Sequence, residues 1–319
     1  MAKGKIFQTM GREIGVFVAL IAVMVVFSAI DEHYFTMANL IDIVDQSTIN
    51  GLIAIGMTFV IVTGGIDLSV GSVMAIVIVL VGRLLTEQGM DPISATIVGI
   101  ILGFALGSFN GFLITRLKLQ PFIATLGTMS VYRGFAYIIT SGWPVLNIPQ
   151  EFRTMLDGDF FSIFRISILI LLIFAFITHI LIKSTRFGNY VYAIGSNEEA
   201  TRLSGVSVDF NKLMTYGLCG VGAALAGMVM LARLGTGEPA AGQGYELNAI
   251  AAAAIGGTSL AGGKGTIIGT LLGAFLLSAL KVGLVVVGVD AFWQYIATGG
   301  IIVVAAYFEV LQNKIKGTH

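Results

Sequence analysis

The run IGVFVALIAVMVVFSAI, residues 14–30, carries no charged side chain and decides the fold class of this chain. A helix needs about 20 apolar residues to cross a bilayer, within a range of about 17–25. Lys3, Lys5 and Arg12 precede the run, as they would in a signal peptide. The run is long, however, and no small-x-small cleavage pattern precedes Asp31. We therefore expect a retained first membrane span.

The composition extends this interpretation to the whole chain. Of the 319 residues, 56% are hydrophobic and 11% are charged, whereas soluble domains carry about 25% charged residues. The net charge is zero, which gives no reason to expect nucleic acid as a partner. The single cysteine, Cys219, suits packing in an apolar run, and three scattered histidines indicate no metal cluster. The sequence predicts an all-α integral membrane protein.

Further apolar runs predict a polytopic bundle of about ten transmembrane helices, with residues 1–319 forming a single transmembrane domain. The second, third and eighth runs are short and adjoin glycine-rich breaks, so we expect short broken helices there. The candidate spans are 14–30, 48–63, 70–85, 93–115, 121–140, 166–182, 213–234, 247–260, 266–288 and 291–308.

The placement of lysine and arginine indicates the orientation, because the cytoplasmic loops of membrane proteins are enriched in these residues. With the N-terminus inside, the outer segments are acidic or mixed, and an even number of spans puts both termini in the cytoplasm. The cytoplasmic segments then hold 12 of the 18 basic residues, namely Lys3, Lys5, Arg12, Arg116, Lys118, Lys183, Arg186, Arg202, Lys212, Lys264, Lys314 and Lys316.

Glycines recur every four residues in two of the predicted spans. Small residues at this spacing let helix backbones approach closely in lipid. We expect these positions to pack within the bundle, with a dimer face as the alternative. They are Gly99, Gly103, Gly107 and Gly111 in the fourth span, and Gly265, Gly269 and Gly273 in the ninth.

The break GGIDLSVG, residues 64–71, separates the second span from the third. A carboxylate that borders hydrocarbon is costly, so Asp67 should be capped, paired or wet. It stands where it can cap the third span by accepting the amide hydrogen of Ser69 or the next residue. Gly64 and Gly65 allow a tight backbone there. The sequence leaves two roles possible for this motif, capping of the third span and lining of a substrate pathway. The two roles are compatible.

A second break, GGTSLAGGKG at residues 256–265, lies between the eighth and ninth spans. A phosphate-binding loop requires Gly, four residues, then Gly-Lys-Ser/Thr. Thr258 stands where the first glycine is required, and Gly265 follows Lys264 where Ser or Thr is required. No predicted strand precedes the segment. We expect that this chain does not bind ATP by itself.

A long polar interruption on the predicted inner side contains AIGSNEEATRLSG, residues 193–205. Glu198, Glu199 and Arg202 recur at helical spacing and predict a short amphipathic helix, for which Gly205 suits the C-terminal end. Polar loops of this length are uncommon unless functional. The residues alone leave open whether the helix rests on lipid or docks into a partner.

The outer stretch 235–246 leads into the eighth span, and its glycines and proline preclude a continuous helix. Glu246 stands at the helix start, where a carboxylate favours the positive end of the macrodipole. Capping is its simpler role, and contact with substrate is the alternative. Arg133 and Lys281 lie in or near apolar runs and are candidates for the pathway. Arg133 could extend its side chain to the membrane interface, which is the simpler account of this residue. Lys281 lies deeper in its apolar run, so this account fits it less well.

Together and in this order, these segments resemble the permease subunits of ribose-type ATP-binding-cassette importers. The similarity covers nearly the whole chain, and the combination is specific to the family although each motif alone is not. The segments that carry it are FTMANL (35–40), GGIDLSVG (64–71), PFIATL (121–126), AIGSNEEATRLSG (193–205), GYELNAIAA (244–252) and GGTSLAGGKG (256–265).

The resemblance implies a permease in the bacterial inner membrane that moves ribose or a similar monosaccharide from the periplasm to the cytoplasm. A periplasmic sugar-binding protein would deliver the sugar. Two copies of the permease, or two related ones, would form the path within membrane lipid. A cytoplasmic ATPase subunit would bind ATP and magnesium and drive alternating access. This chain would then bind no cofactor and catalyse no reaction.

The resemblance also makes residues 183–212 a cytoplasmic coupling loop. In importers of this kind, an inner Glu-Ala-Ala-x-x-x-Gly segment docks in a cleft of the ATPase. The segment from Glu199 to Gly205 fits, with Thr201 replacing the second alanine. The expected coupling residues are Gly195, Glu198, Glu199, Ala200, Arg202 and Gly205.

Two alternatives stay open beside this reading. The first is a self-sufficient secondary transporter or channel, coupled to an ion through Asp67 or Lys281. The second is a membrane-embedded enzyme, which the lack of a nucleophile–base pair makes remote. On the importer reading, the expected pathway residues are Gly64, Gly65, Asp67, Ser69, Glu246 and Lys281.

Overall fold

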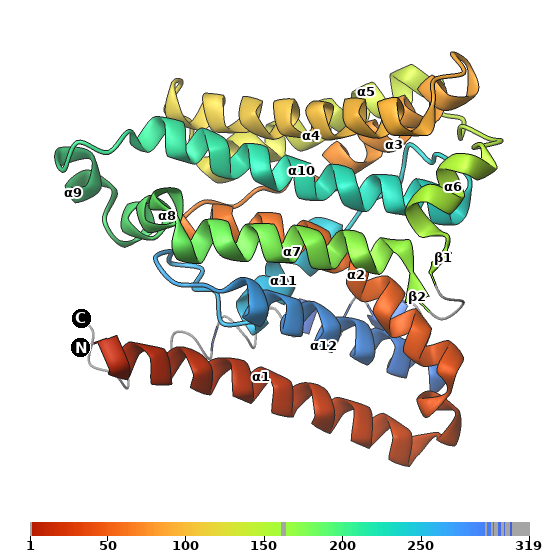
Figure 1. The fold of residues 1–319 in the computed structure, drawn as a ribbon, viewed down its shortest axis with the longest axis horizontal. Helices are drawn as coiled ribbons and strands as arrows, with labels where there is room; N and C mark the ends of the chain where they lie inside the picture. The colour runs from red at the N-terminus through yellow and green to blue at the C-terminus, as the bar shows by residue number, and fades with distance from the viewer. Residues whose placement is uncertain are drawn as a thin grey trace.

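The computed structural model is a bundle of helices, most of which run roughly along one direction (Figure 1). It describes residues 2–160 and 164–290, together with 292–294, 296, 299, 300, 303 and 307. The elements are α1 (Ala2–Ile30), the 3-10 helix η1 (Glu32–Phe35), α2 (Met37–Val62), α3 (Val70–Thr86), α4 (Pro92–Thr115), α5 (Pro121–Thr140), α6 (Gln150–Asp157), β1 (Asp159–Phe160), β2 (Phe164–Arg165), α7 (Ile166–Ser184), α8 (Arg186–Ser196), α9 (Glu198–Leu203), α10 (Val208–Leu234), α11 (Tyr245–Ile255) and α12 (Ile267–Val286).

Seven of these helices are long and apolar enough to cross a membrane: α1, α2, α4, α5, α7, α10 and α12. α3 and α11 are apolar but shorter. The tenth predicted span, 291–308, lies largely outside the described residues. The prediction of a helical, multi-pass membrane protein is therefore confirmed, while the number of ten spans stays a prediction. The only strands in the described part are β1 and β2, which pair as a two-residue antiparallel hairpin.

α1, α2 and α10 each begin well before their predicted apolar runs, and charged residues lie within the added turns of α2 and α10. α2 begins at Met37, although Asp45 lies near its start, because that carboxylate is paired with two arginines of other elements. α10 begins at Val208, although Lys212 lies near its start, because the ammonium is paired with Glu198. Ion pairs with other segments thus allow α2 and α10 to extend into sequence that is more polar than a typical membrane span.

α11 is a short helix bounded by glycines in the left-handed region. Gly244 precedes it with φ of 84°, and Gly257 lies just beyond its end with φ of 89°. Residues with a Cβ rarely adopt such angles. These two glycines make α11 shorter than the predicted run 247–260 and account for the predicted broken helix.

α10 lies at the centre of the bundle and packs against α4, α2 and α3. Its neighbour α4 turns its glycines toward it: a Cβ at Gly103 would crowd Gly220, and one at Gly107 would overlap the carbonyl oxygen of Tyr216. Close approach of the two backbones therefore requires glycine on α4. The two outer positions of the stripe, Gly99 and Gly111, lie against Met228 and Leu213 of the same helix.

The second glycine series joins α11 to α12. A Cβ at Gly269 would overlap the carbonyl oxygen of Gly256, and one at Gly273 would overlap that of Ala252. Gly265, which precedes α12, lies against the side chain of Thr258. Both series thus lie at contacts inside this chain.

Other faces of the bundle carry large exposed apolar side chains, as a surface in lipid should. On α7 they are Leu172, Ile173, Phe176, Ile177 and Ile180, and α1 and α4 carry similar sets. α2, in contrast, is buried along most of its length.

Candidate functional site

The first glycine-rich break folds around Asp67, whose side chain is 1% exposed. Asp67 Oδ1 accepts hydrogen bonds from the backbone amide of Ser69 at 2.9 Å and from its hydroxyl at 2.7 Å. The bond predicted to the Ser69 amide is therefore present. Ser69 itself is the N-cap residue of α3, so Asp67 caps the turn that leads into the helix.

Two neighbouring helices complete this polar cluster. Asn110 of α4 donates to the Ser69 hydroxyl at 2.7 Å and to Asp67 Oδ1 at 3.4 Å. Tyr132 of α5 donates to the side-chain oxygen of Asn110 at 3.4 Å and to the carbonyl of Leu106 at 3.0 Å. Within the described chain, no lysine or arginine forms an ion pair with Asp67. The cluster joins the break to α4 and α5 from inside the bundle.

The end of α8 brings both glycine-rich breaks together. A Cβ at Gly195 would overlap the carbonyl oxygen of Val62, the last residue of α2. The same carbonyl accepts the amide hydrogen of Gly263 at 2.9 Å. Tyr192, one turn earlier on α8, donates to the carbonyl of Gly265 at 2.7 Å. The inner loop therefore contacts both the end of α2 and the second break directly.

The predicted amphipathic helix of the inner loop is α9. Asn197 caps its start by accepting the amide hydrogen of Ala200 at 2.9 Å. Its end is set by Gly205, which has φ of 83°. Between these residues, Glu199 and Ala200 are exposed, and Leu203 is 83% exposed.

The other charges of α9 point toward α10. Glu198 pairs with Lys212 and with Arg202, and Arg202 pairs in turn with Asp209 at 3.1 Å. Burial alone would raise the pKa of Glu198, but the hydrogen bond and charge of Lys212 hold that pKa below its ordinary value. Of the predicted coupling residues, Glu198 and Arg202 thus brace α9 against α10, while Glu199, Ala200 and Gly205 are open to a partner.

The remaining predicted pathway residues lie around α11. Glu246 accepts the amide hydrogen of Gly244 at 3.2 Å, as a residue in the first turn can. Lys281 of α12 donates to the side-chain oxygen of Asn248 at 3.0 Å. Glu246 and Lys281 form no ion pair with each other or with another described residue. Glu246 Oε2 lies against Gly71, at the end of the first break, where an added Cβ would come within 2.6 Å of it. Among the described residues, neither Glu246 nor Lys281 has a hydrogen bond to Asp67.

Arg133 of α5 contacts the broken segment that precedes α11. Its guanidinium donates to the backbone carbonyls of Pro239 at 2.7 Å and Ala241 at 2.6 Å. It also donates to the carbonyl of Gly71 at 3.2 Å. Backbone carbonyls thus hold the half-buried cation against the broken segment and the start of α3.

The chain matches, over residues 39–306, the protein family described as the permease component of a branched-chain amino acid transport system. The chain belongs to this permease family. Among its relatives are the ribose import permease protein RbsC of Bacillus subtilis (strain 168), 40% identical over 95% of this chain and 94% of the relative, and RbsC of Escherichia coli (strain K12), 40% identical over 90% of each. The D-allose transport system permease protein AlsC of E. coli (strain K12) is 36% identical over 94% of this chain and 92% of the relative.

The resemblance drawn from the motifs is thereby confirmed. No solved structure matches the chain. The family and the seven long apolar helices agree that this permease is a multi-pass membrane protein with a role in transport.

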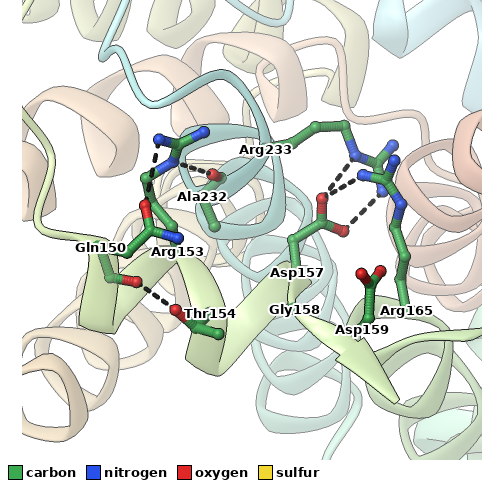
Figure 2. A pocket seen from close by; sticks show the side chains of 9 residues that line it. All are labelled: Gln150, Arg153, Thr154, Asp157, Gly158, Asp159, Arg165, Ala232 and Arg233. Carbon is green, nitrogen blue, oxygen red and sulfur yellow. Dashed lines mark hydrogen bonds and ion pairs between the residues drawn. The ribbon is translucent and has the colours of Figure 1, made fainter. Parts of the chain in front are cut away.

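One polar cluster of the permease escaped the sequence analysis. Asp157, at the end of α6, accepts from Arg233 of α10 at 3.0 and 3.1 Å and from Arg165 of β2 at 2.7 Å (Figure 2). It also accepts from the hydroxyl of Ser167 of α7 at 2.7 Å. Asp45 of α2 pairs with the same two arginines. Burial would raise the pKa of Asp157, but the hydrogen bonds of Arg233 and Ser167 hold it below its ordinary value.

This cluster joins the ends of α2, α6, α7 and α10 beside a pocket of about 310 Å³. The sequence indicated only that the outer segments are acidic or mixed, and did not single out these two aspartates. The available signal was weak. Asp45, Arg165 and Arg233 stand at or near the ends of three different apolar runs, and runs that end on the same side of a membrane can meet. The pocket is lined by Gln150, Arg153, Thr154, Asp157, Gly158, Asp159, Arg165, Ala232 and Arg233 (Figure 2).

Proposed function

We propose that this chain is the membrane permease subunit of an ATP-binding-cassette importer that carries ribose or a similar monosaccharide. The observation that carries the proposal is 40% identity to a ribose import permease over 95% of the chain. Relatives named for D-allose and for galactose or methyl galactoside, at 36% and 34–35% identity, favour a monosaccharide as the substrate class.

The proposed location is the bacterial inner membrane, with about ten spans and both termini in the cytoplasm. The excess of lysine and arginine in the predicted inner segments supports this orientation. The start of α1 and the α8–α9 segment also lie at the same end of the bundle (Figure 1), as a cytoplasmic N-terminus beside a cytoplasmic loop requires.

The proposed partners follow from this role. A periplasmic sugar-binding protein selects the sugar, and a second copy of the chain or a related permease forms the other half of the path. A cytoplasmic ATPase binds ATP and magnesium, so this chain needs no cofactor and performs no covalent chemistry on the sugar.

The segment 183–212 is the proposed coupling loop. Its exposed residues Glu199, Ala200 and Gly205 would meet the ATPase, together with the exposed side chain of Leu203. A movement of α9 would pass to α10 through the pair of Glu198 with Lys212 and that of Arg202 with Asp209. α10 would carry it to α4 through their close glycine contact, because tightly packed helices move as rigid units.

Of the predicted pathway residues, Glu246 is the one we retain as a contact for the sugar. Its side chain is only half-buried and bonds to a backbone amide, whereas the equally half-buried Lys281 is held by the side chain of Asn248. Asp67 and Ser69 are buried and hydrogen-bonded within the bundle, and Gly65 is packed closely against the side chain of Tyr216. We assign these residues, with Gly64, to holding the break between α2 and α3. Lys281 has a similar role between α11 and α12.

The test is uptake of radiolabelled ribose, D-allose and galactose into proteoliposomes that hold the permease with its ATPase and binding protein. We expect uptake of one of these sugars only when ATP and the ATPase are present. A matched preparation contains an ATPase unable to hydrolyse ATP, and it should be inactive. Uptake by the permease alone, driven by an ion gradient, would overturn the proposal in favour of a secondary transporter.

A further inference from the structure

One side of α5 carries polar groups at a depth where lipid would be expected. Ser130 is exposed, Arg133 is half-buried, and Tyr137 is 42% exposed. α5 has 20 residues, so at about 1.5 Å per residue Ser130 lies roughly 13 Å from its start, near the middle of the helix. The corresponding exposed positions of α7 carry only large apolar side chains.

The polar side of α5 continues onto the segment that precedes α11. The three hydrogen bonds of Arg133 to backbone carbonyls hold this segment and the start of α3 against α5. Gln243 of the segment is exposed, and Glu246 is half-buried. Gly71, whose carbonyl accepts from Arg133, also lies against the carboxylate of Glu246. Arg133 and Glu246 therefore meet at Gly71. Ser130 and Tyr137 lie about one turn of α5 on either side of Arg133, so this side of α5 adjoins the segment that precedes α11.

The surface is also open. A Cβ placed at Gly127 or at Gly134, one on each side of Ser130, would meet nothing within 4 Å. The Ser130 hydroxyl donates within its own helix, to the carbonyl of Leu126 at 3.4 Å. The amide of Gln243 and the carboxylate of Glu246 would lose hydrogen bonds to water if they faced lipid, which costs free energy. A surface that is both open and polar at this depth is better explained by contact with water than by contact with lipid.

We propose that this face of α5 and the segment 243–246 form one wall of the aqueous substrate pathway, where Ser130, Arg133, Tyr137, Gln243 and Glu246 contact the hydroxyl groups of a neutral monosaccharide. The inference rests on the proposed function for the identity of the substrate. The side chains suit that substrate because they mix donors and acceptors without a net excess of charge. Arg133 already donates three hydrogen bonds to backbone carbonyls, which leaves few donors for the sugar. Binding of the sugar at this wall should therefore be weak, as passage through the membrane requires.

The first experiment tests whether the wall is wet. In a Cys219→Ala background, Ser130→Cys is compared with Ile173→Cys on the apolar face of α7, in the full complex in proteoliposomes. The probe is a charged, membrane-impermeant thiol reagent. We expect Ser130→Cys to react roughly tenfold or more faster, because only a thiolate reacts and thiols ionise in water rather than in lipid. Excess ribose, with the binding protein and ATP present, should slow the reaction at Ser130→Cys alone.

Equal rates at the two positions would overturn the proposal, and so would reaction of Ser130→Cys only with a lipid-soluble maleimide. A disulfide between two copies at Ser130→Cys without any labelling would also overturn it, since it would show a dry interface between subunits. The labelling rate without sugar does not depend on ATP-driven uptake. If uptake proved independent of the ATPase while Ser130→Cys still reacted rapidly, the proposed function would fail and the pathway wall would stand.

Discussion

α4 and α5 both carry glycines on one side of an apolar helix, but the two helices use them in opposite ways. Each glycine of the α4 stripe lies against α10, so that an added Cβ at Gly103 or Gly107 would overlap the neighbouring backbone. Beside Gly127 and Gly134 of α5, the same added atom would meet nothing within 4 Å. Glycine spacing in a membrane helix therefore indicates a face without a bulky side chain, and only the structure says whether that face is packed or open.

A similar contrast appears at the inner end of the bundle, between two adjacent glutamates. Glu198 is paired with Lys212 and Arg202, whereas Glu199 is exposed. The first contributes to the internal structure of the coupling loop, and the second is available to another protein. In both contrasts, residues of the same type divide into those that hold the bundle together and those that face something outside it.

The largest expected effect tests the packed face. Gly107→Val should destabilise the permease by roughly 1–3 kcal/mol or more, because overpacking forces backbones apart and the new side chain would overlap the carbonyl of Tyr216. Gly127→Val on α5 is the matched control and should leave stability unchanged. Thermal unfolding of the two purified variants in detergent measures the difference. Equal loss of stability in both would show that the α4 and α5 faces do not differ as described.

The next effect separates the two glutamates. Glu199→Lys should lower ATP-driven uptake by roughly tenfold or more through loss of docking, since reversing a charge at an interface costs several kcal/mol, with no change in the unfolding temperature. Glu198→Gln should lower uptake less and should also lower the unfolding temperature, because Lys212 loses its charged partner.

Co-purification of the ATPase with each variant supplies the readout for docking. If Glu199→Lys binds the ATPase and supports uptake normally, Glu199 is not part of the coupling surface. Gly205→Leu offers a second check, since its φ of 83° is unfavourable for leucine and should misplace the end of α9.

The sequence predicted most of the helices. It did not predict which residues of one type are packed inside the bundle and which are exposed. The runs that became α1, α4, α5 and α7 were recognised because a span is a local property of about 20 apolar residues. The bond from the Ser69 amide to Asp67 was predicted for the same reason, since the two residues lie two positions apart. Local chemistry thus fixed the elements and their caps.

What escaped prediction depends on which distant segments meet. The contacts of Gly195 with Val62, and of Val62 with Gly263, join three motifs that sequence analysis treated separately. The pairing of Asp45 with Arg165 and Arg233 extended α2 beyond its apolar run. A charge near hydrocarbon signals that a partner exists, but nothing in the local sequence says which element supplies it.

A smaller effect on uptake is expected from a substitution in the proposed pathway wall. Glu246→Gln retains the oxygen that accepts the Gly244 amide and removes only the charge. We expect a several-fold fall in maximal uptake with no change in the sugar concentration that gives half-maximal uptake. The reason is that the binding protein sets that concentration in the proposed importer, while pathway residues act after the sugar is delivered. An altered half-maximal concentration with unchanged maximal uptake would place Glu246 in docking of the binding protein instead.

The smallest effect is expected at the centre of the packed region. Asp67→Asn keeps an oxygen for the amide and hydroxyl of Ser69, and asparagine caps about as well as aspartate, so most uptake and nearly all stability should be retained. Asp67→Ala removes that acceptor and leaves Ser69 and Asn110 without it, which should cost about 1–3 kcal/mol. Unfolding temperatures and uptake rates of the two variants distinguish a structural hydrogen bond from a required charge. Loss of uptake in a stably folded Asp67→Asn would mean that the negative charge itself acts in transport, and would move Asp67 from the packed part of the molecule to the pathway.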